Sequence, residues 1–194
     1  GKSYEAVYER QHPSGFRWLH ESFGTNWRML EMQSVIGRIQ LRRMADWTDK
    51  RHANAERLRH ALTIFSNTHG VIRLPKFGCA SCPGKCEAAG CLHAQYKFYA
   101  YLRLENLALG WSRDRLLEVI NAEGVPCYQG SCSEVYLEKA FDDTGWRPLE
   151  RLRQAKELGE ASLMFLVHPT LTEAEITKTI DVITKILTEA SNKR

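Results

Sequence analysis

The sequence lacks any apolar run long enough to cross a bilayer, since its longest such stretch, residues 162–167, is far shorter than the roughly 20 residues required. Its first residues, from Gly1 to Ala6, contain neither an initiator Met nor the apolar segment of a signal peptide. We therefore expect no membrane partner, and we expect the chain to begin inside a longer protein.

A strong charge of either sign is also absent. The 27 Lys and Arg exceed the 23 Asp and Glu by only four, which does not by itself indicate a nucleic-acid partner. No internal repeat or low-complexity tract is present. With 43% hydrophobic and 26% charged residues over 194 positions, the chain has the composition of a globular protein that can bury its own core.

Six cysteines are too few, and too clustered, to indicate a secreted disulfide scaffold in a chain of this length. Four of them fall between Cys79 and Cys91. We interpret the compartment as reducing cytoplasm.

The chain divides into three stretches by pattern. Residues 1–28 are polar and aromatic, with Pro13, Gly15 and Gly24 as breakers, and predict an extended arm or loop that contacts a neighbour. Residues 29–69 carry apolar side chains at helical spacing and predict one long linking helix, or two with a bend. Seven Lys or Arg lie between Arg38 and Arg59 in this helix, and we interpret them as a solvated face.

Residues 70–194 alternate strand and helix signals. A turn-rich connection ends near Leu92, and strict alternation then predicts a strand over 96–104. Ser112 and Gly124 predict the two ends of a helix, and residues 125–128 a second strand.

The last third of the chain continues this order. Pro148 predicts the start of a helix that ends at Gly159, and residues 163–167 predict a buried strand. Thr172 and Glu175 form a T-x-x-E capping box before the final helix. Three strands alternating with helices predict an α/β (α+β) fold, with a small sheet covered by helices and preceded by a long N-terminal helix.

One motif could bind phosphate. Residues 24–29 read G-T-N-W-R-M where a loop meets the long helix. A helix N-terminus with free N–H groups, the Asn26 amide and the nearby Arg28 suit a phosphate group. The plainer interpretation is that Asn26 caps the helix and Arg28 is a surface cation, and both can hold together.

The run from His20 to Gln33 resembles the H-E-x-x-G-x-N-x-R-M-x-E-x-Q motif of the DegT/DnrJ/StrS-type sugar aminotransferases. Residues 93–99, H-A-Q-Y-K-F-Y, are similar to the return strand of that family, and residues 166–172 to its H-P-x-L-T segment. The resemblance covers essentially the whole chain. It implies the small C-terminal domain, residues 70–194, of the aspartate-aminotransferase-like (type I pyridoxal phosphate, PLP) fold.

The resemblance also implies a function. Members convert keto groups of nucleotide-linked sugars to amines with glutamate, as cytoplasmic homodimers, in polysaccharide or cell-surface sugar biosynthesis. The residue matching Asn26 reaches the PLP phosphate of the other subunit, and Arg28 has a weaker supporting role. The Schiff-base lysine of the family would lie upstream, so no catalytic residue is assigned here and the chain alone is expected to be inert.

A second cluster has metal-ligand spacing. Cys79, Cys82, Cys86 and Cys91 lie within thirteen residues and could hold one structural Zn²⁺, while reduced thiols or disulfides are the alternatives. The family pattern does not require this cluster. It leaves open a different class of protein, a regulatory or zinc-dependent module that binds nucleic acid or protein.

One departure from the family pattern concerns the substrate. Many relatives carry a Y-x-P-x-H stretch where residues 130–136 here read G-S-C-S-E-V-Y. The sequence therefore does not predict which sugar is the substrate. We expect Cys127 and Cys132 to be small core residues and His168 a structural residue at a strand end.

Overall fold

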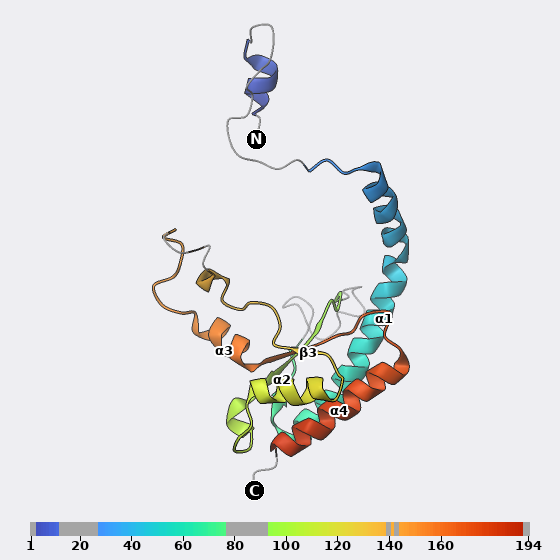
Figure 1. Cartoon of the computed structure of the whole chain (residues 1–194), viewed down its shortest axis with the longest axis vertical. Helices are drawn as coiled ribbons and strands as arrows, with labels where there is room; N and C mark the ends of the chain where they lie inside the picture. Colours follow the sequence, from blue (N-terminus) through green and yellow to red (C-terminus); the bar gives the residue numbers. More distant parts are fainter. Residues whose placement is uncertain (1–2, 12–26, 77–92, 139–140, 142–143, 192–194) are drawn as a thin grey trace. The chain divides into compact units, whose positions relative to one another are not determined.

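The structure is a computed structural model that describes residues 3–11, 27–76, 93–138, 141 and 144–191. It divides into two compact units, Gly1–Arg43 and Met44–Arg194. The helix α1 (Glu31–His69) belongs to both units (Figure 1). We describe each unit by itself.

The first unit begins with the short π-helix η1 (Glu5–Glu9), inside the stretch that we expected to be extended. This part of the prediction is wrong, because local contacts close a turn there. The Ser3 hydroxyl accepts the Ala6 N–H at 3.1 Å, and the rings of Tyr4 and Tyr8 lie 4.9 Å apart.

The helix expected over 29–69 runs without interruption from Glu31 to His69. Gly37 does not break it. Its amino-terminal half exposes a set of apolar side chains: Met32, Val35, Ile36, Ile39, Leu41 and Met44. Its carboxy-terminal half buries Ala55, Leu58, Leu62 and Phe65, spaced three or four apart so that they form one stripe.

A four-stranded antiparallel sheet forms the centre of the second unit. Its strands are β1 (Ile72–Arg73), β2 (Phe98–Leu102), β3 (Cys127–Tyr128) and β4 (Ser162–Phe165), in the order β1-β2-β4-β3. Sequence reasoning missed β1, because two residues in a turn-rich stretch carry no periodicity. The pairing of Ile72 with Leu102 and of Arg73 with Tyr101 defines β1.

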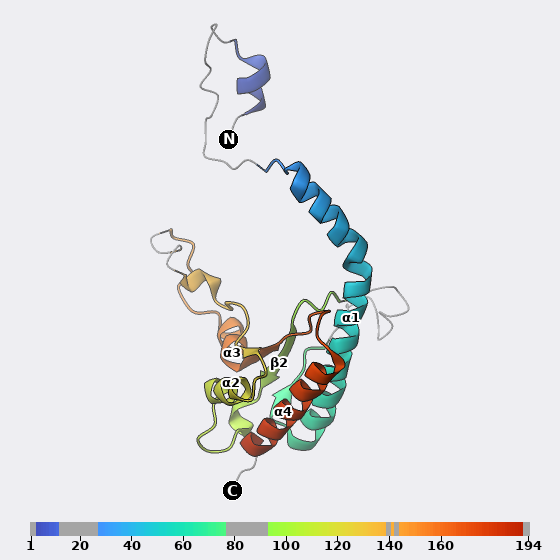
Figure 2. The same ribbon diagram turned by 45° about the vertical axis from the view of Figure 1, so that its right-hand side comes forward.

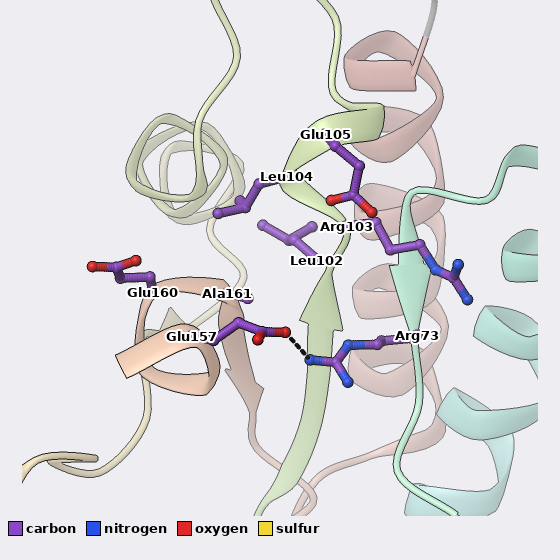
Figure 3. Close-up of a pocket in the computed structure, with 8 residues that line it drawn as sticks. All are labelled: Arg73, Leu102, Arg103, Leu104, Glu105, Glu157, Glu160 and Ala161. Atoms are coloured by element: carbon purple, nitrogen blue, oxygen red, sulfur yellow. Dashed lines mark ion pairs between the residues drawn. The ribbon is translucent and has the colours of Figure 1, made fainter. Parts of the chain in front are cut away.

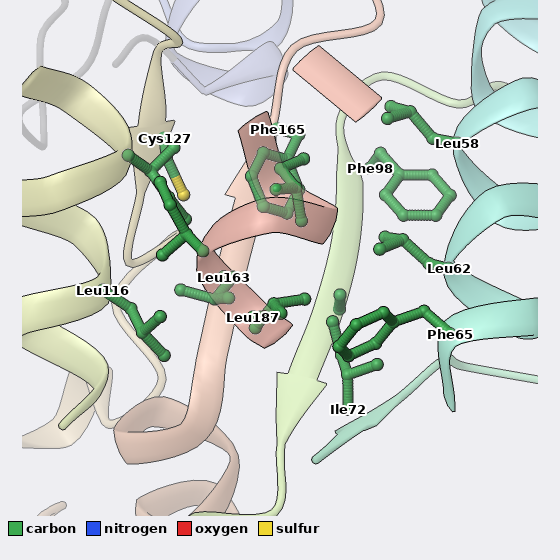
Figure 4. Packing of buried hydrophobic residues seen from close by; sticks show 14 of the residues in the cluster. Leu58, Leu62, Phe65, Ile72, Phe98, Leu116, Cys127, Leu163, Phe165 and Leu187 are labelled. Atoms are coloured by element: carbon green, nitrogen blue, oxygen red, sulfur yellow. The ribbon is translucent and has the colours of Figure 1, made fainter. Parts of the chain in front are cut away.

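Three helices supply the apolar side chains that cover one face of the sheet. They are α1, α2 (Arg113–Ala122) and α4 (Glu173–Ser191), seen in Figure 2. Phe98 and Phe165 of the sheet pack with Leu62, Leu116 and Leu187 of these helices (Figure 4). This contiguous apolar cluster is the core of the unit.

Two helix starts follow the predicted caps. The Ser112 hydroxyl accepts the Arg115 N–H at 3.2 Å before α2. Thr172 and Glu175 form the capping box of α4: the Thr172 hydroxyl accepts the Glu175 N–H at 3.3 Å, and the Glu175 carboxylate accepts the Thr172 N–H at 2.7 Å.

The helix expected from Pro148 to Gly159 is displaced. The helix α3 runs from Arg153 to Ala161, and Gly159 lies inside it. Residue Leu152 is extended, and its N–H donates to the Tyr136 hydroxyl at 2.9 Å instead of opening a helix. A Cβ at position 159 would lie 2.1 Å from the Ser133 hydroxyl, so this glycine permits a close approach and does not end the helix.

The described part of the second unit also contains two complete 3₁₀ turns. They are η2 (Leu104–Asn106), which follows β2, and η3 (Val135–Leu137), which follows β3. Among the described residues, no helix has both the length and the hydropathy that a bilayer crossing demands.

Candidate functional site

The second face of the sheet carries polar and aromatic side chains. Alternation along β2 directs Phe98, Ala100 and Leu102 into the core and leaves Tyr99 and Tyr101 half-buried on the opposite side. The two tyrosine rings stack with centroids 6.5 Å apart, and the Arg73 guanidinium lies 5.4 Å from the Tyr101 ring. This face is suited to a polar ligand.

One pocket of about 370 Å³ opens between the end of β2 and α3 (Figure 3). Its charged residues are Arg73, Arg103, Glu105, Glu157 and Glu160. Arg73 and Glu157 form an ion pair at 3.5 Å, in which the Arg73 side chain is 40% exposed and the Glu157 side chain 62%. Burial raises the pKa of neighbouring Tyr101, and so does Tyr99, whereas Arg73 opposes the shift. This pocket has mixed charge and selects no sign of ligand.

A larger pocket of about 490 Å³, here called the β3–η3 pocket, follows β3. It is lined by Gln129, Gly130, Ser131, Cys132, Ser133, Glu134, Leu137, Glu138 and Gly159. Most of these are small or hydroxyl-bearing residues. Such a lining offers donors and acceptors to a hydroxyl-rich ligand.

Tyr99 holds the first turn of this pocket. Its hydroxyl accepts the Ser131 N–H at 3.2 Å and lies 3.3 Å from the Ser131 hydroxyl. Gly130 has φ +95°, and a Cβ there would lie 2.6 Å from the Tyr99 ring. Only glycine fits at this position without displacing the ring.

Glu134 organises the other side of the pocket. Its side chain is only 10% exposed, and its carboxylate accepts from the Tyr136 hydroxyl at 2.6 Å and from Arg151 Nε at 2.9 Å. The Arg151 guanidinium makes a second, short bond to the other carboxylate oxygen. Arg151 and then Tyr136 lower the pKa of Glu134 to about 2. The carboxylate is therefore ionised near neutral pH and acts as an acceptor only.

PLP is held in its enzymes by a Schiff base to a lysine. None of the residues that line the two pockets is a lysine, so neither pocket offers a Schiff-base partner. These two pockets therefore do not fit PLP as a covalently held cofactor.

The sequence-predicted cofactor residues lie in the first unit. Asn26 lies outside the described residues. Arg28 is exposed and precedes α1 by three positions. Since the structure describes only one of the two residues, it does not test their joint role, which stays a prediction.

The predicted metal ligands Cys79, Cys82, Cys86 and Cys91 also lie outside the described residues, so the zinc prediction is untested. Within the part of the chain that the structure describes, no group of three or more His, Cys, Asp or Glu could hold a metal ion.

The two remaining cysteines differ. Cys127 is buried in the core, and burial raises the pKa of its thiol to about 12. Cys132 is exposed and lines the β3–η3 pocket, so the expectation of a core residue is wrong for Cys132. It follows β3, where the chain has left the sheet.

His168 makes one contact within its own turn and one with α1. Its Nδ1 lies 2.8 Å from the Thr170 hydroxyl, and its backbone carbonyl accepts the Asn54 amide of α1 at 3.2 Å. These contacts agree with a structural role after β4.

Sequence reasoning missed the grouping of Glu134, Tyr136 and Arg151. Glu134 and Tyr136 stand in a stretch that we noted only as a departure from the family. Arg151 is 17 positions from Glu134, and no motif spacing links them. A buried carboxylate must be paired, but its partner cannot be read from the sequence.

Comparisons with known proteins give one coherent result. The sequence profile of the DegT/DnrJ/EryC1/StrS aminotransferase family matches residues 7–184. The solved structure of an aminotransferase from Psychrobacter cryohalolentis is 54% identical, with a TM-score of 0.79, and the match covers 99% of this chain and 47% of that chain. No match to the chain was found among curated protein sequences.

More distant structures share the fold. A DegT DnrJ EryC1 StrS aminotransferase from Brucella abortus is 22% identical with a TM-score of 0.64, and the match covers 94% of this chain and 40% of that chain. PseC of Helicobacter pylori is 13% identical with a TM-score of 0.66, over 93% of this chain and 43% of that one. The chain thus spans about half the length of the structures it matches, and it belongs to the DegT/DnrJ/EryC1/StrS aminotransferase family.

Proposed function

We propose that this chain is the carboxy-terminal part of a PLP-dependent aminotransferase that converts a keto group of a nucleotide-linked sugar to an amine, with glutamate as donor. The observation that carries the proposal is the 54% identity along 99% of the chain to an aminotransferase of about twice its length. The regulatory or zinc-dependent binding module receives no support from the comparisons.

Relatives of the same fold support the choice of substrate and cofactor. One solved structure is a GDP-4-keto-6-deoxymannose-3-dehydratase with a trapped PLP–glutamate geminal diamine. Another, PseC, is an aminotransferase of pseudaminic acid biosynthesis. By analogy, we propose that the amino sugar made by the complete enzyme is used in polysaccharide or cell-surface sugar biosynthesis. We propose that the enzyme acts in the cytoplasm.

We assign three parts to the chain. Residues 1–28 form the interface arm of a homodimer, in which Asn26, assisted by Arg28, serves the PLP phosphate of the other subunit. Residues 29–69 form the linking helix. Residues 70–194, including the loop 79–91, form the small domain, whose β3–η3 pocket faces the sugar.

The apolar side chains on the first half of α1 support this assignment. Ile36 and Val35 are each 57% exposed, and Met32 is 73% exposed. A contiguous apolar set of this kind indicates a surface that other protein covers. The missing half of the enzyme, or its second subunit, would supply that cover.

The test compares the complete polypeptide with the 194-residue chain, each supplied with PLP and L-glutamate. The complete enzyme should aminate at least one UDP-, dTDP- or GDP-linked keto hexose. The chain alone should show no transamination, and borohydride should trap no single labelled lysine. A labelled lysine with turnover in the chain alone would overturn the proposed inertness, and a complete enzyme that aminates none of these sugars would overturn the function.

Structural zinc on the four cysteines of residues 79–91 is a separate proposal. Elemental analysis of protein purified without chelator should find about one equivalent of zinc if the cluster binds it. Less than about a tenth of an equivalent would exclude it.

A further inference from the structure

Residues 131–138, here called the wall of the β3–η3 pocket, bury almost no apolar side chains. None of the three residues of η3 is buried, and Val135 and Leu137 are 52% and 43% exposed. A segment that buries no apolar side chain gains little from the core and depends on its polar contacts for order. The question is which contacts hold it.

Polar bonds join this wall to the stretch that precedes α3. Glu134 binds Arg151, and the Tyr136 hydroxyl donates to Glu134 while it accepts the Leu152 N–H. We call these groups the Glu134 network. Arg147 reinforces it by donating to the carbonyls of Tyr136, at 2.8 Å, and Glu138, at 3.3 Å.

The Glu134 network borders the pocket through Glu134 itself. Glu134 lines the pocket, yet both of its carboxylate oxygens are engaged by Arg151 and one of them also by Tyr136. A carboxylate held in this way has little capacity left for a substrate or for a proton. It can instead hold the chain on either side in one shape.

We propose that Glu134 is a positioning residue that, through Arg151 and Tyr136, holds residues 131–138 in the shape that receives the sugar part of the substrate. This inference rests on the proposed function. The network orders the wall before the substrate binds, so the free energy of substrate binding is not reduced by the entropy lost in ordering it.

The first arm of the test is amide hydrogen exchange on the 194-residue chain. The amides of Leu137, Glu138 and Leu152 are all hydrogen-bonded in this region. In E134Q they should exchange about tenfold faster than in wild type, because the charge-assisted bonds to Arg151 are lost. The matched control E123Q removes an ion pair to Lys185 at 3.2 Å elsewhere and should leave these amides unchanged.

The second arm uses the complete enzyme and separates its two half-reactions. With the keto hexose that wild type aminates best, E134Q should raise KM about tenfold, while the half-reaction with L-glutamate stays within about twofold. The KM of E134D, which keeps the negative charge, should fall between the values for wild type and E134Q. General destabilisation would instead slow both half-reactions together.

Each outcome decides the inference. Two exchange results would overturn it: exchange in E134Q as slow as in wild type, or exchange in wild type as fast as in an unstructured peptide. Two kinetic results would also overturn it: an equal loss of rate in both half-reactions of E134Q, or an unchanged KM for the sugar. If the complete wild-type enzyme aminates none of the sugars, the proposed function itself fails and the substrate role of Glu134 falls with it. A working enzyme with unchanged KM refutes the positioning role alone.

Discussion

Among the described carboxylic acids, Glu134 has the most strongly lowered pKa. Arg151 and Tyr136 lower its pKa from the ordinary value of 4.5 to about 2. Since the folded state binds its proton more weakly than the unfolded state, this contribution to stability is complete above the unfolded pKa. It is lost as the pH falls through the folded pKa.

We therefore predict that the free energy of unfolding of wild type decreases as the pH falls from about 4.5 to about 2, and that E134Q flattens this decrease. R151Q should flatten it similarly, because it removes the main cause of the shift. Urea unfolding at several pH values measures the slope. An E134Q variant as acid-sensitive as wild type would contradict the assignment.

Gly130 allows a second prediction at the residue scale. Gly130 and Gly145 both have positive φ, +95° and +72°, but a Cβ would meet Tyr99 at 2.6 Å in the first case and no described atom within 4 Å in the second. G145A should cost only the backbone strain of about 1–2 kcal/mol. G130A should cost about 1–3 kcal/mol more, because the Tyr99 ring must move.

Thermal unfolding of the two glycine variants measures this difference. Equal destabilisation would mean that the contact between Gly130 and Tyr99 does not constrain the turn. An intact turn in G130A would also leave the bond between Ser131 and Tyr99 in place, which exchange at the Ser131 amide reports.

At the scale of elements, the capping box of α4 is the clearest case of local sequence acting locally. T172A removes the hydroxyl that accepts the Glu175 N–H and should destabilise the protein by about 1 kcal/mol. T179A removes a hydroxyl that bonds only to the Glu175 carbonyl inside the same helix. Because Ala is the better helix former, T179A should be neutral or slightly stabilising.

Urea unfolding followed by circular dichroism compares these two variants. If T172A is as stable as wild type, the box contributes nothing measurable. Equal loss in both would indicate a general sensitivity of α4 to substitution.

Helix α3 shows where element prediction fails. The pattern from Pro148 onward favours an earlier start, but Leu152 donates its N–H to Tyr136 and remains extended. The start of α3 is thus decided by a partner 16 positions away, which local periodicity cannot reveal. Likewise, Gly159 looks like a terminator in sequence but lies inside the helix, where its missing side chain leaves room for Ser133.

At the scale of the whole molecule, one helix illustrates two environments. Leu62 in α1 is 1% exposed, whereas Leu41 in the same helix is 65% exposed. L62A should destabilise the second unit by about 2–5 kcal/mol, since it removes core contacts and leaves a cavity. L41A should change stability by less than about 0.5 kcal/mol in the chain alone.

Denaturant unfolding of the 194-residue chain provides the measurement for both leucines. A large loss for L41A would indicate that the apolar face of α1 is already covered in this chain, for example by self-association. A concentration-dependent midpoint would identify that case.

The sequence by itself determined the elements whose signals are local and periodic. These are the long helix, the alternating strand β2, the caps at Ser112 and Thr172, and the motif around Asn26 that places the chain in its family. Each depends on residues within a few positions of one another, and such local interactions do not depend on where the rest of the chain packs.

Only the tertiary structure decided the rest. It paired the two-residue strand β1 with β2, displaced α3, and brought Glu134, Tyr136 and Arg151 together beside one pocket. The physical reason is that a buried carboxylate, a short edge strand or a close glycine contact is set by partners remote in sequence. No local pattern specifies those partners.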